Sequence, residues 1–312
     1  MTELVDVAVI VVTYNSGTLI EDLVASLPSG LAGLTWHLVI ADNDSSDDTV
    51  MRIRAAAPDA TVVETGRNGG YAAGINAGLE VAPPHRAALI LNPDVRLTAG
   101  AGATLLAAFS DRTVGIVAPL LIDANGELIA SQRREPTVLR AWADALVGAS
   151  RAGRFPRLGE VVTDPKLYRS ATDTDWAEGS TLLIRSECLQ ACGPWDESFF
   201  LYSEETEYAL RARDAGFRTR FVPEAKAIHL EGGSNPQLCA LLVVNRVRFF
   251  RRRHGRVASA AFWAALVARE GSRALLGSAN SRESVEALTD RARLRETPGP
   301  HSIRRRPVNA AA

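Results

Sequence analysis

Four short apolar runs alternate with helical segments in the N-terminal third of the chain. The runs cover residues 6–13, 36–41, 60–64 and 87–91. The segments between them have the apolar spacing of amphipathic helices, at residues 16–27, 47–57 and 71–81. The first of these helices should close before Pro28. Because parallel strands need crossover connections, this alternation predicts an α/β protein with a mostly parallel sheet covered by helices.

Polar side chains gather where each of these four runs ends. They are Thr13, Tyr14 and Asn15, then Asp42 and Asn43, then Arg67 and Asn68, then Asn92 and Asp94. Ligands of such sheets bind at the carboxyl ends of the strands, so we expect one binding site there. Asp42 could accept from a pyrimidine imide or hold ribose hydroxyls, and Asp94 could carry a cation that bridges a diphosphate. Each aspartate could equally be a turn-forming or capping residue.

A second concentration of reactive groups lies at residues 195–234. Glu204, Glu205 and Glu207 follow an aromatic run, and His229 precedes a Gly-Gly-Ser turn. The carboxylates fit either capping charges at a helix start or a general base. His229 together with Asp94 would suit Mg²⁺ or Mn²⁺, with phosphate oxygens and water as further ligands.

Several common protein classes are excluded by what the sequence lacks. The first strand is followed by residues 13–17, Thr-Tyr-Asn-Ser-Gly, which is neither a dinucleotide-binding glycine motif nor a P-loop. The three cysteines, Cys188, Cys192 and Cys239, form no CxxC pair and suit core packing in a reducing cytosol. The N-terminal residues lack a basic signal region, and no apolar run could span a bilayer. We therefore expect a cytoplasmic protein.

Charge is distributed unevenly along the chain, although the formal net charge is only −1. From Arg246 onward there are 15 arginines and 5 acidic residues, a balance of +10 that leaves −11 for the remainder. Such a basic extension suggests an anionic partner such as membrane phospholipid, a lipid pyrophosphate or nucleic acid. No nucleic-acid recognition fold is visible, so we expect no nucleic-acid partner. Residues 238–270 could form amphipathic helices on a membrane surface or helices packed on the domain, and residues 295–312 suit a solvated tail.

Six motifs in order resemble the family 2 inverting glycosyltransferases with the GT-A fold, especially the bacterial rhamnosyltransferase-like branch. They lie at residues 11–15, 41–47, 67–76, 91–95, 179–185 and 195–234. The resemblance implies a Rossmann-like, mostly parallel GT-A sheet flanked by helices, and we expect the basic C-terminal segment to form a helical extension. We expect residues 1–120 to be the nucleotide-sugar-binding half, 121–237 the acceptor-side half of the same domain, and 238–312 the extension with a disordered C-terminus.

The resemblance also implies a role for each matching residue. Thr13, Tyr14, Asn15 and Asp42 would line the nucleotide pocket, while Arg67, Gly70, Gly74 and Asn76 would border ribose and diphosphate. Asn92 stands at the first position of the family's D-x-D-type metal motif, Asp94 would be the main metal ligand, and His229 the second. Gly179 and Ser180 would lie beside the acceptor. The family usually has Glu-Asp where this chain has Glu204-Glu205, so the expected base is Glu205, with Glu204 as the alternative.

The expected activity is metal-dependent transfer of a hexose from a nucleotide-diphosphate sugar to an acceptor hydroxyl, with inversion. The candidate donor is dTDP-L-rhamnose, the cofactor Mg²⁺ or Mn²⁺, and the acceptor a glycan or polyprenyl-linked glycolipid of the cell envelope or an exopolysaccharide. We expect peripheral attachment to the inner face of the membrane through the basic tail. The alternatives are transfer of another sugar, such as galactofuranose or N-acetylglucosamine, a small-molecule acceptor, or a nucleotide-sugar-binding protein with impaired catalysis.

Overall fold

A nine-stranded central sheet organises the part of the chain that the computed structural model describes, residues 4–230 and 236–303. Its order is β3-β2-β1-β4-β10-β6-β11-β5, with β8 paired to β11. The strands are β1 (Val5–Thr13), β2 (Trp36–Asp42), β3 (Thr61–Glu64), β4 (His85–Leu91), β5 (Val95–Leu97), β6 (Val114–Ile122), β8 (Thr172–Thr174), β10 (Thr181–Arg185) and β11 (Arg218–His229). Strands β1 to β4 run parallel, and so do β6 and β11, whereas β10 is antiparallel between β4 and β6. The mostly parallel sheet predicted from the sequence is confirmed.

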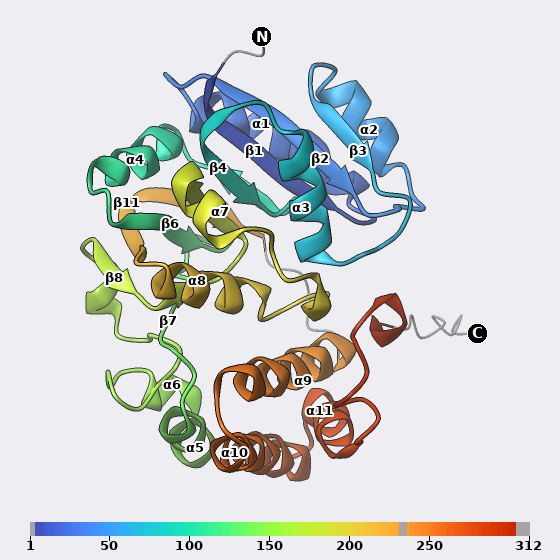
Figure 1. The fold of residues 1–312 in the computed structure, drawn as a ribbon, viewed down its shortest axis with the longest axis vertical. Helices are drawn as coiled ribbons and strands as arrows, with labels where there is room; N and C mark the ends of the chain where they lie inside the picture. Colours follow the sequence, from blue (N-terminus) through green and yellow to red (C-terminus); the bar gives the residue numbers. More distant parts are fainter. Residues whose placement is uncertain (1–3, 231–235, 304–312) are drawn as a thin grey trace.

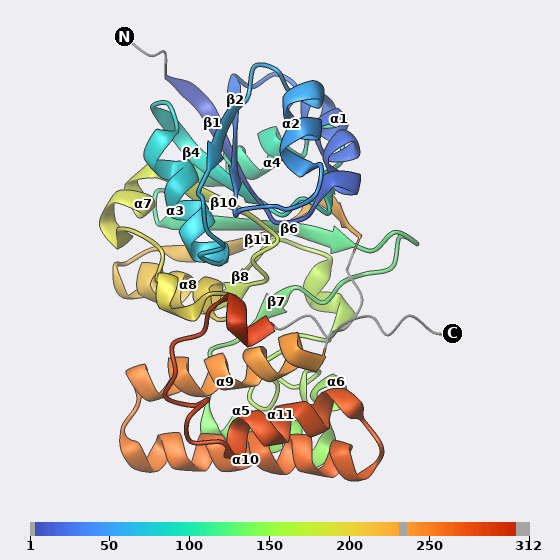
Figure 2. The same ribbon diagram turned by 90° about the vertical axis from the view of Figure 1, so that its right-hand side faces the viewer.

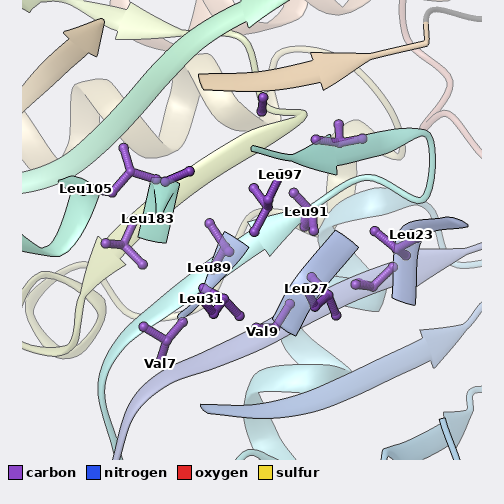
Figure 3. Close-up of a cluster of buried hydrophobic side chains, with 14 of the residues drawn as sticks. Val7, Val9, Leu23, Leu27, Leu31, Leu89, Leu91, Leu97, Leu105 and Leu183 are labelled. Carbon is purple, nitrogen blue, oxygen red and sulfur yellow. The ribbon is translucent and has the colours of Figure 1, made fainter. Parts of the chain in front are cut away.

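Helices cover both faces of this sheet (Figure 1). They are α1 (Ile20–Gly30), α2 (Thr49–Ala56), α3 (Tyr71–Val81), α4 (Ala101–Ala107), α7 (Ser186–Cys192) and α8 (Glu204–Asp214). Alternate side chains of β1 point to opposite faces. Val7, Val9 and Val11 join the core under α1 (Figure 3), while the residues between them join the core under α3. A buried parallel strand is therefore apolar on both faces, which is why it reads as a continuous apolar run.

The first helix differs from the prediction that Pro28 ends it. It begins after a 3₁₀ turn, η1 (Gly17–Leu19), and continues to Gly30 with Pro28 inside its last turn. Pro28 removes one hydrogen-bond donor, but Leu31 still donates its N–H to the carbonyl of Leu27. One missing bond near a helix end is tolerated because the C-terminal residues Leu27 and Gly30 are buried in the core.

A second layer of helices lies against the sheet domain (Figure 2). It contains α5 (Val138–Val147), α6 (Ala149–Ala152), α9 (Pro236–Arg253), α10 (Arg256–Leu275) and α11 (Ala279–Thr289). Val243, Val247, Phe250, Phe262 and Leu266 form a buried apolar core in this layer. Of the two alternatives for the C-terminal helices, packing on the protein is the one observed. No helix within residues 4–230 and 236–303 is long and apolar enough to cross a membrane.

The chain between β6 and β10 supplies the link between the two layers. It contains a small two-stranded sheet of β7 (Gln132–Arg133) and β9 (Trp176–Ala177), and α5 follows β7 directly. Strand β6 crosses the expected boundary at residues 120 and 121 and pairs with β10 and β11, so both halves share one sheet. The Gly-Gly-Ser turn at 232–234 and the Arg-rich residues 304–306 lie outside the described residues.

Candidate active site

The part of the candidate site that is expected to bind a nucleotide lies at the carboxyl ends of β1 and β2. Their register places Thr13 beside Asp42, and the Thr13 hydroxyl donates to Asp42 Oδ1 at 2.8 Å. Ser45 donates from its backbone N–H to Oδ2 at 2.8 Å and from its hydroxyl to Oδ1 at 2.6 Å. Both Thr13 and Asp42 are buried. The carboxylate of Asp42 is thus held rigidly as an acceptor at the edge of the sheet.

The loop after β1 is shaped by Asn15, whose φ is 51°. Its backbone N–H donates to the Ser45 hydroxyl at 2.8 Å, and its Oδ1 accepts the N–H of Ser46 at 2.9 Å. Its Nδ2 is buried and has no partner, which leaves a donor for a ligand. Tyr14, between these anchored residues, is 48% exposed and available as a stacking surface.

An open hollow of about 250 Å³ lies next to this edge, lined by Arg67, Asn76 and Glu197 among others. Asn76 also ties α3 to a distant part of the chain. Its Nδ2 donates to the carbonyl of Trp195 and to Glu197 Oε1, both at 3.0 Å, and its Oδ1 accepts the Trp195 N–H at 2.9 Å. Gly74 is not in this lining; a β-carbon there would lie 2.4 Å from Val12, so α3 approaches β1 closely at that point.

Asp94 and His229 meet because β5 and β11 are paired. The register places His229 beside Val95, and the N–H of Leu230 donates to the carbonyl of Asp94 at 2.9 Å. His229 Nε2 lies 3.3 Å from Asp94 Oδ2, and its Nδ1 lies 3.1 Å from Oε1 of Glu178. Burial disfavours the charged imidazole, but hydrogen bonds to the two carboxylates outweigh it and raise the pKa of His229 to about 10.

This cluster fits a divalent cation in part. Asp94 Oδ1 is buried and has no hydrogen-bond partner, so an oxygen of the type that Mg²⁺ and Mn²⁺ prefer is left unsatisfied. His229 adds an imidazole nitrogen, and Glu178 can orient that ring from its other side. No three side chains among the described residues are arranged as a complete metal site. Asp94 and His229 would therefore hold the ion together with oxygens of the ligand.

The two candidate bases occupy the first turn of α8. The preceding residues Phe200, Tyr202 and Ser203 all have positive φ, between 64° and 73°, in a tight bend that presents the helix start to the site. Glu204 is buried, and burial followed by the charge of Glu205 raises its pKa well above the usual value. Glu205 is partly exposed, although its Oε2 is buried without a partner, and burial raises its pKa to about 7. Glu205 is thus the carboxylate that can reach a substrate and change charge near neutral pH.

The acceptor-side residues lie directly against this base. A β-carbon on Gly179 would lie 3.2 Å from Cβ of Glu205, so a glycine lets the β9–β10 turn pass closely. Ser180 accepts the N–H of Asn92 through its carbonyl at 2.9 Å, while its hydroxyl is buried without a partner. The structure therefore brings the turn around Gly179, the Asn92 turn and Glu205 together.

Four further residues belong to the candidate site and were not predicted from the sequence, namely Tyr71, Arg133, Glu178 and Asn245. Tyr71 donates its hydroxyl to the carbonyl of Gly179 at 3.2 Å, and its pKa is raised first by burial and then by four carboxylates around it. Those carboxylates are Glu204, Asp94, Glu205 and Glu178. The charge of Arg133 on β7 favours the ionised forms of Glu178 and Glu205, although burial still raises the pKa of Glu205. Tyr71 thus marks the point where the donor and acceptor motifs meet.

The fourth residue is Asn245, in the middle of α9. Its Nδ2 donates to the carbonyls of Phe199 and Leu201 at 2.6 and 2.8 Å, and more weakly to Tyr202 at 3.3 Å. Asn245 is fully buried and so fixes the bend that precedes Glu204 and Glu205. A polar amide directly after the apolar helix stretch at residues 238–244 was the signal that could have identified it.

Polar groups at the strand ends, an Asp–His pair and a carboxylate at the start of α8, carried on this sheet, are the arrangement expected of a GT-A glycosyltransferase. Residues 8–160 match the family described as Glycosyl transferase family 2. Residues 8–160 thus carry a glycosyltransferase family 2 domain, and the chain is similar to rhamnosyltransferases of that family.

Two relatives match most of the chain. N-acetylglucosaminyl-diphospho-decaprenol L-rhamnosyltransferase of Mycobacterium tuberculosis is 29% identical over 234 residues, covering 71% of this chain and 75% of the relative. Low-salt glycan biosynthesis hexosyltransferase Agl10 of Haloferax volcanii is 27% identical over 232 residues, covering 73% and 68%. Both are named as sugar transferases, in agreement with the family.

Two solved structures show the same fold. The mannosyltransferase PcManGT from Pyrobaculum calidifontis, in complex with GDP-Man and Mn²⁺, has a TM-score of 0.55 at 18% identity and covers 92% of this chain and 85% of its own. GalNAc-T7 with UDP, GalNAc and Mn²⁺ has a TM-score of 0.56 at 17% identity, and the match covers 80% of this chain and 48% of that protein. At these identities the likeness concerns the fold alone.

Proposed function

We propose that the protein transfers a hexose from a nucleotide diphosphate to a hydroxyl group of a lipid-linked glycan, with inversion at the anomeric carbon. The observation that carries this proposal is Glu205, a partly exposed carboxylate with its pKa raised to about 7, lying against Gly179. Asp94 lies in the same part of the structure, because the negative charges of Asp94 and Glu205 both raise the pKa of the Tyr71 hydroxyl.

The residues support a single displacement. The acceptor oxygen forms a bond to the anomeric carbon, the bond from that carbon to the diphosphate oxygen breaks, and the acceptor proton passes to Glu205. Asp42 and Asn15 would orient the nucleotide, and Arg67 lies where it can contact phosphate. A divalent cation held by Asp94 and His229 would act as a Lewis acid that neutralises the leaving diphosphate. One base and one displacement invert the configuration.

The proposed donor is dTDP-L-rhamnose, and the proposed acceptor is a polyprenyl-diphosphate-linked sugar of the cell envelope. Support comes from the name of the mycobacterial relative, an L-rhamnosyltransferase that acts on N-acetylglucosaminyl-diphospho-decaprenol. Such an acceptor would require the protein to work at the cytoplasmic face of a membrane, to which we propose that it attaches peripherally. Other hexose donors remain the alternatives within the same chemistry.

The test is turnover of dTDP-L-rhamnose, UDP-sugars and GDP-mannose with a polyprenyl-diphospho-N-acetylglucosamine acceptor, in Mg²⁺, in Mn²⁺ and after chelation. Product formation with dTDP-L-rhamnose, lost on chelation and restored by Mn²⁺, is expected. Asp94→Asn should lose activity and bind Mn²⁺ more weakly in titrations with nucleotide present, whereas the exposed-loop control Asn125→Ala should match the wild type. Tight donor binding without turnover on any acceptor would instead identify a catalytically impaired nucleotide-sugar-binding protein.

A further inference from the structure

Five large apolar side chains are exposed at or just after the C-terminal ends of α5, α6 and α10. Leu146 and Val147 close α5 and are 77% and 49% exposed, and Phe155, just after α6, is 58% exposed. Leu275 and Leu276, at the end of α10, are 90% and 89% exposed. Single exposed apolar residues are ordinary, but a group of large ones marks a binding surface. We call these five residues and the adjoining Arg151, Arg154 and Arg157 the α5–α10 face.

The members of the α5–α10 face come from segments that are adjacent in space. Helices α5 and α10 pack on each other, with Ala141 of α5 in the same buried core as Phe262 and Leu266 of α10. Asp144 near the end of α5 feels the charges of Arg269 and Arg273 near the end of α10, so the two C-terminal ends lie together. Figures 1 and 2 both show these helices at the end of the molecule opposite β1, β2 and β3.

The exposed charge around this face has one sign. Within residues 137–160 and 256–277 the acidic residues are Asp144, Glu160 and Glu270, and all three are buried. By contrast, Arg151, Arg154 and Arg157 are exposed, and their side chains have no ion pair within the described residues. Three arginines of α9 are instead paired, Arg246 with Glu160, Arg252 with Asp196 and Arg253 with Asp214. Free positive charge is therefore available at the α5–α10 face.

We propose that the α5–α10 face is the surface through which this protein binds an anionic lipid bilayer. Phe155 and the four aliphatic side chains enter the boundary between headgroups and acyl chains, and the three arginines contact lipid phosphates. A second copy of the chain is a poorer occupant, since two such faces would bring unpaired arginines together. The proposal rests on the proposed membrane acceptor. The α5–α10 face is also connected to the candidate site, because α5 directly follows β7 and the charge of Arg133 on β7 favours the ionised forms of Glu178 and Glu205.

The experiment measures binding of the full chain to vesicles, without sugar transfer, so that it can fail separately from the proposed activity. Wild-type protein should sediment with phosphatidylglycerol–phosphatidylcholine vesicles and much less with phosphatidylcholine alone. Arg154→Gln with Arg157→Gln should weaken binding about tenfold or more, given the contribution of each arginine near an anionic surface. Leu146→Ser with Phe155→Ser should weaken it to a similar degree. The matched control is Arg291→Gln with Arg295→Gln, which removes the same charge from exposed, unpaired arginines after α11 and should bind like the wild type.

A Phe155→Trp variant gives a second reading that does not depend on loss of binding. Brominated lipids should quench its added fluorescence relative to the wild type, because the residue enters the bilayer. The proposal is overturned if the wild-type protein does not bind anionic vesicles, or if only the Arg291/Arg295 variant loses binding. It is also overturned if the face variants abolish a concentration-dependent dimer while vesicle binding stays unchanged, since the occupant would then be a second copy.

Discussion

A β-carbon on Gly70 would lie 2.1 Å from the carbonyl oxygen of Phe200. This approach joins two motifs that are far apart in the chain, and the N–H of Tyr71 donates to the same carbonyl at 2.7 Å. Both residues also have positive φ, 91° at Gly70 and 64° at Phe200. The glycine of the donor-side motif therefore fixes the bend that presents Glu204 and Glu205.

Replacing Gly70 with alanine should lower the free energy of unfolding by roughly 1–3 kcal/mol and reduce turnover, because backbone strain and a direct collision coincide. Gly66→Ala is the matched control, since Gly66 also has a positive φ of 67° but no atom within 4 Å of the added carbon. Denaturant unfolding and steady-state kinetics of both variants measure the difference. Equal stability losses would show that only the backbone conformation matters at Gly70.

Glu205→Gln should reduce kcat by about 10²- to 10⁴-fold, the usual contribution of a general base. A base must be deprotonated, and burial raises the pKa of Glu205 to about 7, so wild-type kcat should rise as pH increases from 6 to 8 and then level off. Glu205→Asp should retain much of the activity, while Glu204→Gln should keep both the rate and the pH profile. If Glu204→Gln removes the pH dependence, Glu204 is the base.

Glu204→Gln should also change how stability depends on pH. Burial, followed by the charge of Glu205, raises the pKa of Glu204 well above that of the unfolded chain, so the folded state retains a proton that the unfolded state releases. The contribution to stability is present at acid pH, below the unfolded pKa, and is lost as pH rises toward the folded pKa. The glutamine variant should therefore gain stability over the wild type at pH 8.5, on the order of 1 kcal/mol or more. Urea unfolding at pH 5 and pH 8.5 measures the free energy of unfolding of both proteins. An equal stability difference between the variant and the wild type at the two pH values would contradict a raised pKa of Glu204.

Asn245→Ala should loosen the bend before α8, because three backbone carbonyls lose the donor that holds them. We expect a loss of about 1–3 kcal/mol in unfolding free energy. Because Asn245 acts through the position of Glu205, kcat should fall several-fold while nucleotide affinity, measured by calorimetry, stays near the wild-type value. The exposed-loop variant Asn125→Ala provides the control. A parallel loss of nucleotide affinity would mean that the whole site, and not the base alone, depends on α9.

The local pattern of the sequence was enough to predict the first four strands and the polar residues at their ends. Apolar runs such as Val5–Thr13 fold into buried parallel strands, and parallel strands align their carboxyl ends, so Thr13 and Asp42 had to become neighbours. Such local rules misplaced the end of α1. The helix continues for about one turn beyond the end predicted at Pro28, because that last turn is buried in the core.

Only the tertiary structure decided which distant residues complete the site. His229 reaches Asp94 because β11 pairs with β5, and Glu178 reaches His229 because a turn between β9 and β10 passes the same point. Asn245 and Tyr71 likewise act across long sequence separations, on Phe199 and Gly179. The sequence by itself determined the strands, their polar ends and the family motifs, since these depend on local periodicity. Long-range strand pairing and helix packing determined the electrostatic environment of the carboxylates proposed as the base, because pKa values depend on burial and on charges that only folding brings together.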